Sequence, residues 1–215
     1  DLRGKASRFT AEALSSGTLF SWWGGDIAAA VGGQYRRDTF RHDWSDDVNR
    51  GELITIGQAP DFSGHQESLS LYGEVKIPFV QLVELTLSGR YEKYLNSFSN
   101  FSPKVALLFR PADWLSLRGS WGRAFRAPSV YQTSAVQSAQ PSVSDGGTFI
   151  FVNTQTFGNP NLKPEKSKSY NAGATVRPIK GLEFNVDFYG FTYSNLIVKE
   201  NPQPIIDQER ADTMA

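Results

Sequence analysis

The stretch from Leu69 to Tyr91 contains two runs of alternating side chains, separated only by a short break at Pro78-Phe79. Apolar residues share one parity in each run: Leu69, Leu71, Val75 and Ile77, then Val83, Leu85, Leu87 and Tyr91. Successive side chains of a strand point to opposite faces, so each run predicts a strand with one apolar and one polar face. The apolar face is the core in a soluble sandwich and meets lipid in a membrane barrel. Alternation alone does not distinguish a soluble sandwich from a membrane barrel.

The composition narrows the class of protein. The 215 residues carry a formal net charge of +0 with both signs interspersed, which argues against nucleic-acid binding because that function needs a basic face. The chain has no cysteine, which excludes disulfides and thiolate metal sites. Phe, Tyr, Trp and Gly are frequent, as in all-β chains with many turns. No apolar run reaches the ~18–20 residues of a spanning helix. We expect both ends to be cuts inside a longer protein.

Alternation predicts seven strands, over residues 27–40, 68–78, 82–94, 101–110, 114–125, 167–177 and 182–198. Long polar loops are expected at 42–66 and 127–166, with a short link at 95–99. Residues 1–20 give a weak signal that fits a helix or the frayed end of a strand. We treat the whole chain, 1–215, as part of one β-barrel domain.

The connections are sorted by length. Following the strands up and down places the short turns near 24, 79, 112 and 179 at one end and the three other connections at the opposite end. Outer-membrane barrels show this pattern, with short periplasmic turns and long extracellular loops. Two aromatic clusters fit the two membrane interfaces: Trp22, Trp23, Phe79 and Trp114 at the short-turn end, and Tyr91, Tyr94, Trp121 and Phe125 at the other. The fold class predicted is an antiparallel up-and-down transmembrane β-barrel.

Two segments carry a family resemblance. The first runs from Ser102-Pro103-Lys104 through Arg110-Pro111-Ala112-Asp113-Trp114-Leu115 to Phe125-Arg126-Ala127-Pro128-Ser129. The second is Gly158-Asn159-Pro160-Asn161-Leu162-Lys163-Pro164-Glu165. Gly33-Gln34-Tyr35-Arg36-Arg37 and Leu71-Tyr72-Gly73-Glu74 are weaker matches. In order and spacing these segments resemble TonB-dependent outer-membrane receptors.

The resemblance implies a barrel of about 22 strands, of which this chain supplies about seven. It implies residence in the outer membrane of a Gram-negative bacterium, contact with outer-membrane lipid, an N-terminal plug domain, and energy from the TonB-ExbB-ExbD complex. The cargo is expected to be a small scarce nutrient, such as an iron chelate, vitamin, glycan or peptide. Nothing in the chain resembles the plug or the TonB box. The alternative is a soluble all-β ligand- or glycan-binding module.

No catalytic, metal-binding or cofactor-binding residues are predicted. His42 and His65 fall in one expected loop, and a metal shared with Asp43, Asp46 or Glu67 is less favoured than a solvated loop. A lipid-hydrolysing barrel would need a His beside a Ser, and neither histidine has such a partner. Arg126 is expected to be structural, at the base of a loop. Candidate substrate contacts are lumen-facing or in the second long loop: Arg90, Glu92, Arg118, Asp187, Tyr189, Phe149, Phe151 and Phe157.

Overall fold

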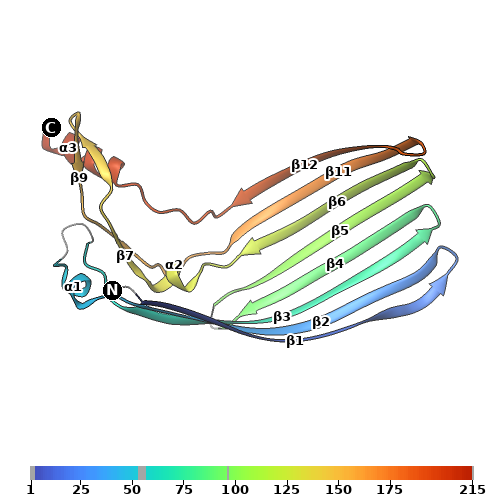
Figure 1. Ribbon diagram of the computed structural model, residues 1–215, viewed down its shortest axis with the longest axis horizontal. Coiled ribbons are helices and arrows are strands. Elements are labelled where there is room, and N and C mark those ends of the chain that lie inside the picture. Colours follow the sequence, from blue (N-terminus) through green and yellow to red (C-terminus); the bar gives the residue numbers. More distant parts are fainter. Residues whose placement is uncertain (1–2, 53–56, 96, 215) are drawn as a thin grey trace.

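The computed structural model describes residues 3–52, 57–95 and 97–214. One curved sheet of eight antiparallel strands, in the order β1-β2-β3-β4-β5-β6-β11-β12, forms the body of the chain (Figure 1). Its strands are β1 (Arg3–Trp22), β2 (Gly25–Asp43), β3 (Phe62–Val80), β4 (Val83–Tyr94), β5 (Ser99–Ala112), β6 (Leu115–Arg126), β11 (Glu165–Ile179) and β12 (Leu182–Ser194). Each strand pairs with its neighbour in an up-and-down order, and β1 and β12 form the two edges. The predicted fold class is confirmed, as an open segment of a barrel wall.

The remaining elements lie at one end of the sheet, opposite the short turns (Figure 1). They are α1 (Asp46–Arg50), α2 (Val130–Ser134), β7 (Val136–Ala139), β8 (Ser142–Asp145), β9 (Thr148–Phe151), β10 (Thr154–Phe157) and α3 (Pro202–Met214). β7 pairs with β10 and β8 with β9, so the second long loop contains two small two-stranded sheets, of which β8–β9 is a hairpin. Part of the first expected loop, at 53–56, lies outside the described residues. Within the described ranges, no helix is both long and apolar enough to cross a membrane.

The strand count from the sequence was too low by one in the main sheet. β1 was not assigned as a strand, although it pairs with β2 along almost its whole length. Its outward face carries mainly small residues, such as Ala11, Ala13 and Ser15, so it lacks the apolar alternation that marked the others. The predicted end of the last strand was wrong, because β12 ends at Ser194 rather than at residue 198.

The two faces of the sheet differ in burial and polarity. In β3, Ser68 and Ser70 are buried, whereas Leu69 and Leu71, which alternate with them, are exposed. Residues directly opposite each other on paired strands project from the same face, so the register extends the two faces of β3 to the other strands. The inner face is therefore polar and crowded, and the outer face is apolar and uncovered. A soluble sandwich would bury the apolar face, so this arrangement fits a wall whose outer side meets lipid.

Aromatic residues bound the apolar outer face at both ends. At the short-turn end, the Trp22 and Phe79 rings are 5.7 Å apart, and the Trp22 Nε1 donates to the Pro78 carbonyl at 2.9 Å. At the loop end, Trp121 lies opposite Tyr170 in neighbouring strands, and Tyr91 lies opposite Phe101. Tyr94 was wrongly assigned to this outer belt. It lies on the inner face, buried and stacked on Phe98 with ring centroids 4.9 Å apart.

Candidate ligand-binding face of the barrel wall

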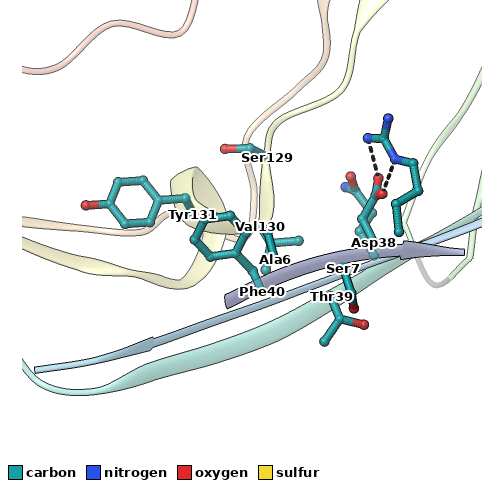
Figure 2. A pocket seen from close by; sticks show the side chains of 10 residues that line it. Ala6, Ser7, Asp38, Thr39, Phe40, Ser129, Val130 and Tyr131 are labelled. Atoms are coloured by element: carbon teal, nitrogen blue, oxygen red, sulfur yellow. Dashed lines mark hydrogen bonds and ion pairs between the residues drawn. The ribbon is translucent and has the colours of Figure 1, made fainter. Parts of the chain in front are cut away.

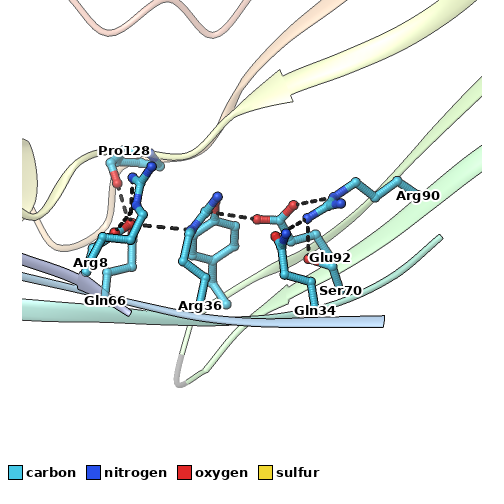
Figure 3. Close-up of polar contacts among 10 residues, drawn as sticks. Arg8, Gln34, Arg36, Gln66, Ser70, Arg90, Glu92 and Pro128 are labelled. Atoms are coloured by element: carbon cyan, nitrogen blue, oxygen red, sulfur yellow. Dashed lines mark hydrogen bonds and ion pairs between the residues drawn. The ribbon is translucent and has the colours of Figure 1, made fainter. Parts of the chain in front are cut away.

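A continuous polar network covers the inner face of β1 to β4 (Figure 3). Arg36 lies at its centre, with its Nη2 3.2 Å from Glu92 Oε1 and 2.8 Å from the Tyr94 hydroxyl. Arg90 donates to the other Glu92 oxygen at 3.0 Å and to the Ser70 hydroxyl at 2.8 Å. Two of the sequence-predicted site residues, Arg90 and Glu92, are thus brought into direct contact. The network is shared by several strands, so it holds their inner faces together.

The same network extends toward the loop end through Asp38. Its carboxylate lies 3.4 Å from Arg36 Nε and accepts from Arg8 Nε at 2.5 Å. Three guanidinium groups therefore share two carboxylates, Asp38 and Glu92. The Glu92 side chain is only 7% exposed, so its charge depends on these partners rather than on water. This balance leaves little free charge for a ligand at Arg90 or Glu92.

A second network joins β6, β11 and β12. Arg118 binds both carboxylate oxygens of Asp187, with Nε donating to Oδ1 at 2.9 Å, and its Nη1 donates to the Thr175 hydroxyl at 2.8 Å. The Thr175 hydroxyl in turn donates to Asn185 at 2.6 Å. Arg118 and Asp187, also predicted from the sequence as ligand contacts, are each other's partner. Their bidentate geometry is the strong form of an ion pair, which suits a structural role in the wall.

On β6 and β11, closer to the long loops than the Arg118–Asp187 pair, lies a strip of small side chains on the inner face. We call it the shelf: Gly122 and Ala124 of β6 with Ser167 and Ser169 of β11. Lys104, Gly122, Ser169 and Phe191 follow one another in register across β5, β6, β11 and β12. Three strand spacings of ~4.8 Å separate the outer two of them by ~14 Å. The shelf is therefore a shallow floor, flanked by a lysine on one side and an aromatic ring on the other.

The aromatic side of the shelf is a row of three rings on β12. Tyr189 and Phe191 have ring centroids 5.8 Å apart, and Phe191 and Tyr193 are 6.4 Å apart. All three lie on the inner face, opposite Asn171, Ser169 and Ser167, and all are exposed. On the opposite side, Lys104 forms no ion pair within the part of the chain that the structure describes. An exposed row of rings on a polar inner face can stack on a flat ligand.

Sequence reasoning named Tyr189 but missed the rest of the shelf. Phe191 and Tyr193 repeat its parity at i+2 and i+4, a signal that was present in the sequence. The small residues opposite them could not be recognised without the register of β6 and β11, which are separated in the chain by the second long loop.

The second long loop folds back over the inner face at the end of the sheet where the long loops lie. Ser129 caps α2, because its hydroxyl accepts from the Gln132 amide at 3.2 Å while the Gln132 side chain accepts from the Ser129 amide at 3.0 Å. Tyr131 then packs on Phe40 and Phe62, with ring centroids 6.4 and 6.2 Å away. A cavity of about 410 Å³ remains between α2 and β1–β2, with the Arg8–Asp38 ion pair at its side (Figure 2).

The loop phenylalanines lie away from the inner-face residues. Phe149 and Phe151 belong to the β8–β9 hairpin, as expected for a folded hairpin, and are 78% and 79% exposed. This hairpin contacts α3, where Arg210 Nη1 donates to Asp145 Oδ1 at 2.8 Å. Phe157 lies on β10 and is also exposed. The structure therefore does not gather these three rings with Arg90, Arg118 and Tyr189 into one site.

The two histidines do not form a metal site with each other. His42 pairs with Phe62 and Thr39 pairs with His65, which places the two imidazoles on opposite faces of the sheet. His42 instead stacks on Trp44, with ring centroids 4.9 Å apart. Across the residues with described positions, no group of three or more metal-binding side chains comes together.

Arg126 closes the base of the second long loop. Its Nε donates to Glu165 Oε2 at 2.5 Å, and the amide of Ile197 donates to the other oxygen at 2.8 Å. These bonds lower the pKa of Glu165 to about 2, with the Arg126 hydrogen bond as the largest cause. The pair lies five residues beyond the Trp121–Tyr170 pair, outside the apolar band. It joins β6, β11 and the segment after β12, which fits the structural role expected of Arg126.

Comparisons with known proteins agree with this geometry. The family described as "TonB dependent receptor-like, beta-barrel" matches residues 3–210. The chain is 28% identical over 163 residues to the heme/hemopexin utilization protein C of Haemophilus influenzae, which covers 70% of this chain and 21% of that protein. It is 32% identical over 109 residues to a hemin receptor of Yersinia enterocolitica (44% and 15%). A probable TonB-dependent siderophore receptor of Acinetobacter baumannii, PirA, is 26% identical over 106 residues (48% and 14%).

Solved structures of such receptors share the fold. A mutant of the ferric enterobactin receptor PfeA from Pseudomonas aeruginosa aligns with a TM-score of 0.70 at 19% identity, covering 88% of this chain and 27% of that one. The Serratia marcescens hemophore receptor HasR aligns with a TM-score of 0.66 at 18% identity (91% and 34%). The chain spans about a fifth or less of the length of the three receptors from Haemophilus, Yersinia and Acinetobacter. It belongs to the β-barrel family of the TonB-dependent receptors, which are receptors and transporters rather than enzymes.

Proposed function

We propose that this chain is part of the barrel wall of a Gram-negative outer-membrane receptor that imports an iron chelate, either a siderophore complex or haem. The relatives support this cargo class, since their names describe siderophore, hemin or heme receptors. The observation that carries the proposal is the shelf, with exposed aromatic rings on one side and Lys104 on the other. Vitamins, glycans and peptides remain the competing cargoes.

The shelf has the chemistry that such a cargo needs. Catecholate and porphyrin ligands present flat aromatic rings and carry negative charge, so they can stack on the Tyr189–Tyr193 row and approach the Lys104 ammonium. The backbones of the two sides lie ~14 Å apart, and the Lys104 side chain leans over Gly122 toward the rings, so a ligand on the rings can approach it. The arginines of the two networks are already paired with carboxylates, so Lys104 is the better candidate for contact with an anion.

Energised import requires parts that this chain does not supply. By family likeness, an N-terminal plug would fill the barrel and the TonB-ExbB-ExbD complex would move it. The polar inner face, with its carboxylates and guanidinium groups, is a surface on which a hydrated plug can rest. The outward apolar face is the surface for outer-membrane lipid.

The test uses the full-length receptor in an iron-starved Gram-negative host lacking its own receptors. We expect a ferric siderophore or hemin to restore growth in a TonB-dependent manner. Tyr189→Ala with Phe191→Ala should weaken chelate binding ~10-fold or more, since each lost stacking contact contributes about 0.5–1.5 kcal/mol beyond its buried area. Phe184→Ala, on the outer face of the same strand, is the matched control. Growth restored only by a vitamin, glycan or peptide would refute the cargo class.

A further inference from the structure

Three basic residues form a cluster on the outer face of β6 and β11, which we call the basic cluster: Arg123, Lys166 and Lys168. Arg123 and Lys168 are directly opposite each other in register. Lys166 follows Lys168 at i+2, so it projects from the same face. All three side chains are exposed. The sheet thus presents three positive charges side by side on the face that points away from the barrel lumen.

Among the residues with described positions, no carboxylate pairs with these charges. Besides Arg123, the residues paired with the two lysines across β6 and β12 are Phe125, Thr192 and Ser194, none of which is acidic. The Phe125 ring is turned toward Tyr94 and Phe98, with ring centroids 6.2 and 6.1 Å away. The nearest glutamate in sequence, Glu165, has the opposite parity and is bound by Arg126 and Ile197. None of the three cations forms an ion pair in the described part of the chain. Like charges directly opposite each other destabilise a strand pair, so an external anion at this place would be favourable.

The cluster has a defined height on the wall. It lies just beyond the Trp121–Tyr170 pair, and the Arg123 guanidinium stacks over the Trp121 ring at 5.4 Å from its centroid. Arg123 comes nine positions after Trp114, which lies at the short-turn end. At ~3.3 Å per residue and a tilt of ~40°, this corresponds to ~23 Å, close to the ~25 Å apolar band of an outer-membrane barrel. The basic cluster therefore falls at the level of lipid headgroups, on the side of the long loops.

From this placement we propose that the basic cluster is a binding site for phosphate groups of an anionic lipid in the outer leaflet of the membrane. Guanidinium and ammonium groups are the side chains that bind phosphate, with Arg123 able to form paired hydrogen bonds. The ring of Trp121 below holds Arg123 at the interface, where the acyl chains of the lipid begin. A plug cannot serve as the partner, because these side chains point outward. The proposal rests on the proposed function only in requiring that the chain lies in an outer membrane.

The test uses the full-length receptor purified in neutral detergent micelles. Binding of lipid A carrying both phosphates is compared with that of its dephosphorylated form, by native mass spectrometry and by fluorescence of a labelled lipid. We expect wild type to prefer the phosphorylated lipid at least 10-fold. The triple variant R123Q/K166Q/K168Q should lose this preference, and R123K/K166R/K168R should keep it. The control K5Q/K93Q/K199Q removes three other lysines, which are not clustered, and should keep it too.

Equal binding of the two lipids by wild type, or equal loss in the control variant, would overturn the proposal. Full displacement of the lipid by millimolar inorganic phosphate would also overturn it, because the site would then be one for a free ion. Heat-dependent mobility on gels verifies that each variant is folded. Chelate uptake by the triple variant should remain at the wild-type level, since the cluster faces away from the shelf. Failure of chelate uptake in wild type would refute the proposed function and leave the lipid result intact.

Discussion

Glu92 offers a sharp test of the inner-face network. Its carboxylate is 7% exposed and joins Arg36 at 3.2 Å to Arg90 at 3.0 Å, whose side chains are 24% and 33% exposed. Glu92→Gln keeps the shape but changes the charge among Arg8, Arg36, Arg90, Asp38 and Glu92 from +1 to +2. Arg36 retains Asp38, whereas Arg90 is left with the neutral Ser70 and Gln34 acceptors.

The expected loss of unfolding free energy follows from these contacts. Removing one partner of a buried ion pair costs about 3–5 kcal/mol, and partial exposure of both arginines reduces this to about 2 kcal/mol. The matched control is Glu84→Gln on the same face of the same strand. Glu84 pairs with Lys76 at 3.0 Å, but the Lys76 side chain is 51% exposed, so the loss should stay below about 1 kcal/mol.

The assay is urea unfolding of the full-length receptor in detergent micelles, followed by tryptophan fluorescence and by heat-dependent gel mobility. The two variants should have the same slope against urea and different midpoints. A midpoint for Glu92→Gln equal to that of Glu84→Gln would refute the argument that burial of Glu92 makes this network strong.

Three further predictions concern the wall, the shelf and the loop base. Leu85→Arg places a charge on the lipid-facing side, which should destabilise the inserted barrel by about 2–4 kcal/mol and impair its assembly. Thr86→Arg faces the lumen and should assemble normally. Membrane fractionation measures the yield of both variants, and equal yields would contradict the face assignment. Ser169→Leu fills the shelf and should lower chelate uptake ~10-fold, while Ser116→Leu near the short-turn end should not; equal uptake by the two would remove the shelf from the site. The Glu165 pKa of about 2 lies below the unfolded value, so its hydrogen bonds contribute stability above about pH 4.5 that is lost only as pH falls toward 2. Hydrogen exchange at Ile197 should stay slow at pH 4 in wild type and be fast in Glu165→Ala, which removes the acceptor; fast exchange in both would contradict the clamp.

Alternation was sufficient to predict most of the wall. The Leu69–Tyr91 runs became β3 and β4, with their apolar residues outward, because a period of two is itself the geometry of a strand. β1 escaped prediction because Ala11, Ala13 and Ser15 on its outward face give no hydropathy contrast. Tyr94 was misplaced since its position at a strand end suggested an interface, while its parity, shared with Glu92, already indicated the lumen.

The site was harder to predict than the wall. Arg118 and Asp187 were named separately as ligand contacts, but they are 69 residues apart in the chain and only the pairing of β6, β11 and β12 shows that they bind each other. The basic cluster and the shelf likewise depend on the β6–β11 register, which the intervening loop hides from the sequence. The face on which a residue lies can be predicted from alternation along one strand, whereas its neighbours on other strands are known only once the register of the sheet is known.

The most direct test of the account is the two-faced wall itself. The chain has no cysteine, so single cysteines can be placed at successive positions from 83 to 92 of β4 in a full-length receptor otherwise free of cysteine. In membranes, a lipid-borne quencher should reach a fluorophore at odd positions such as Leu85 and Leu87, and a water-soluble maleimide should label even positions such as Glu84 and Arg90. The predicted result is therefore an alternation with a period of two, with quenching at odd positions and labelling at even positions. Water-soluble labelling at the odd positions, or no periodicity, would contradict the assignment of a lipid-facing barrel wall.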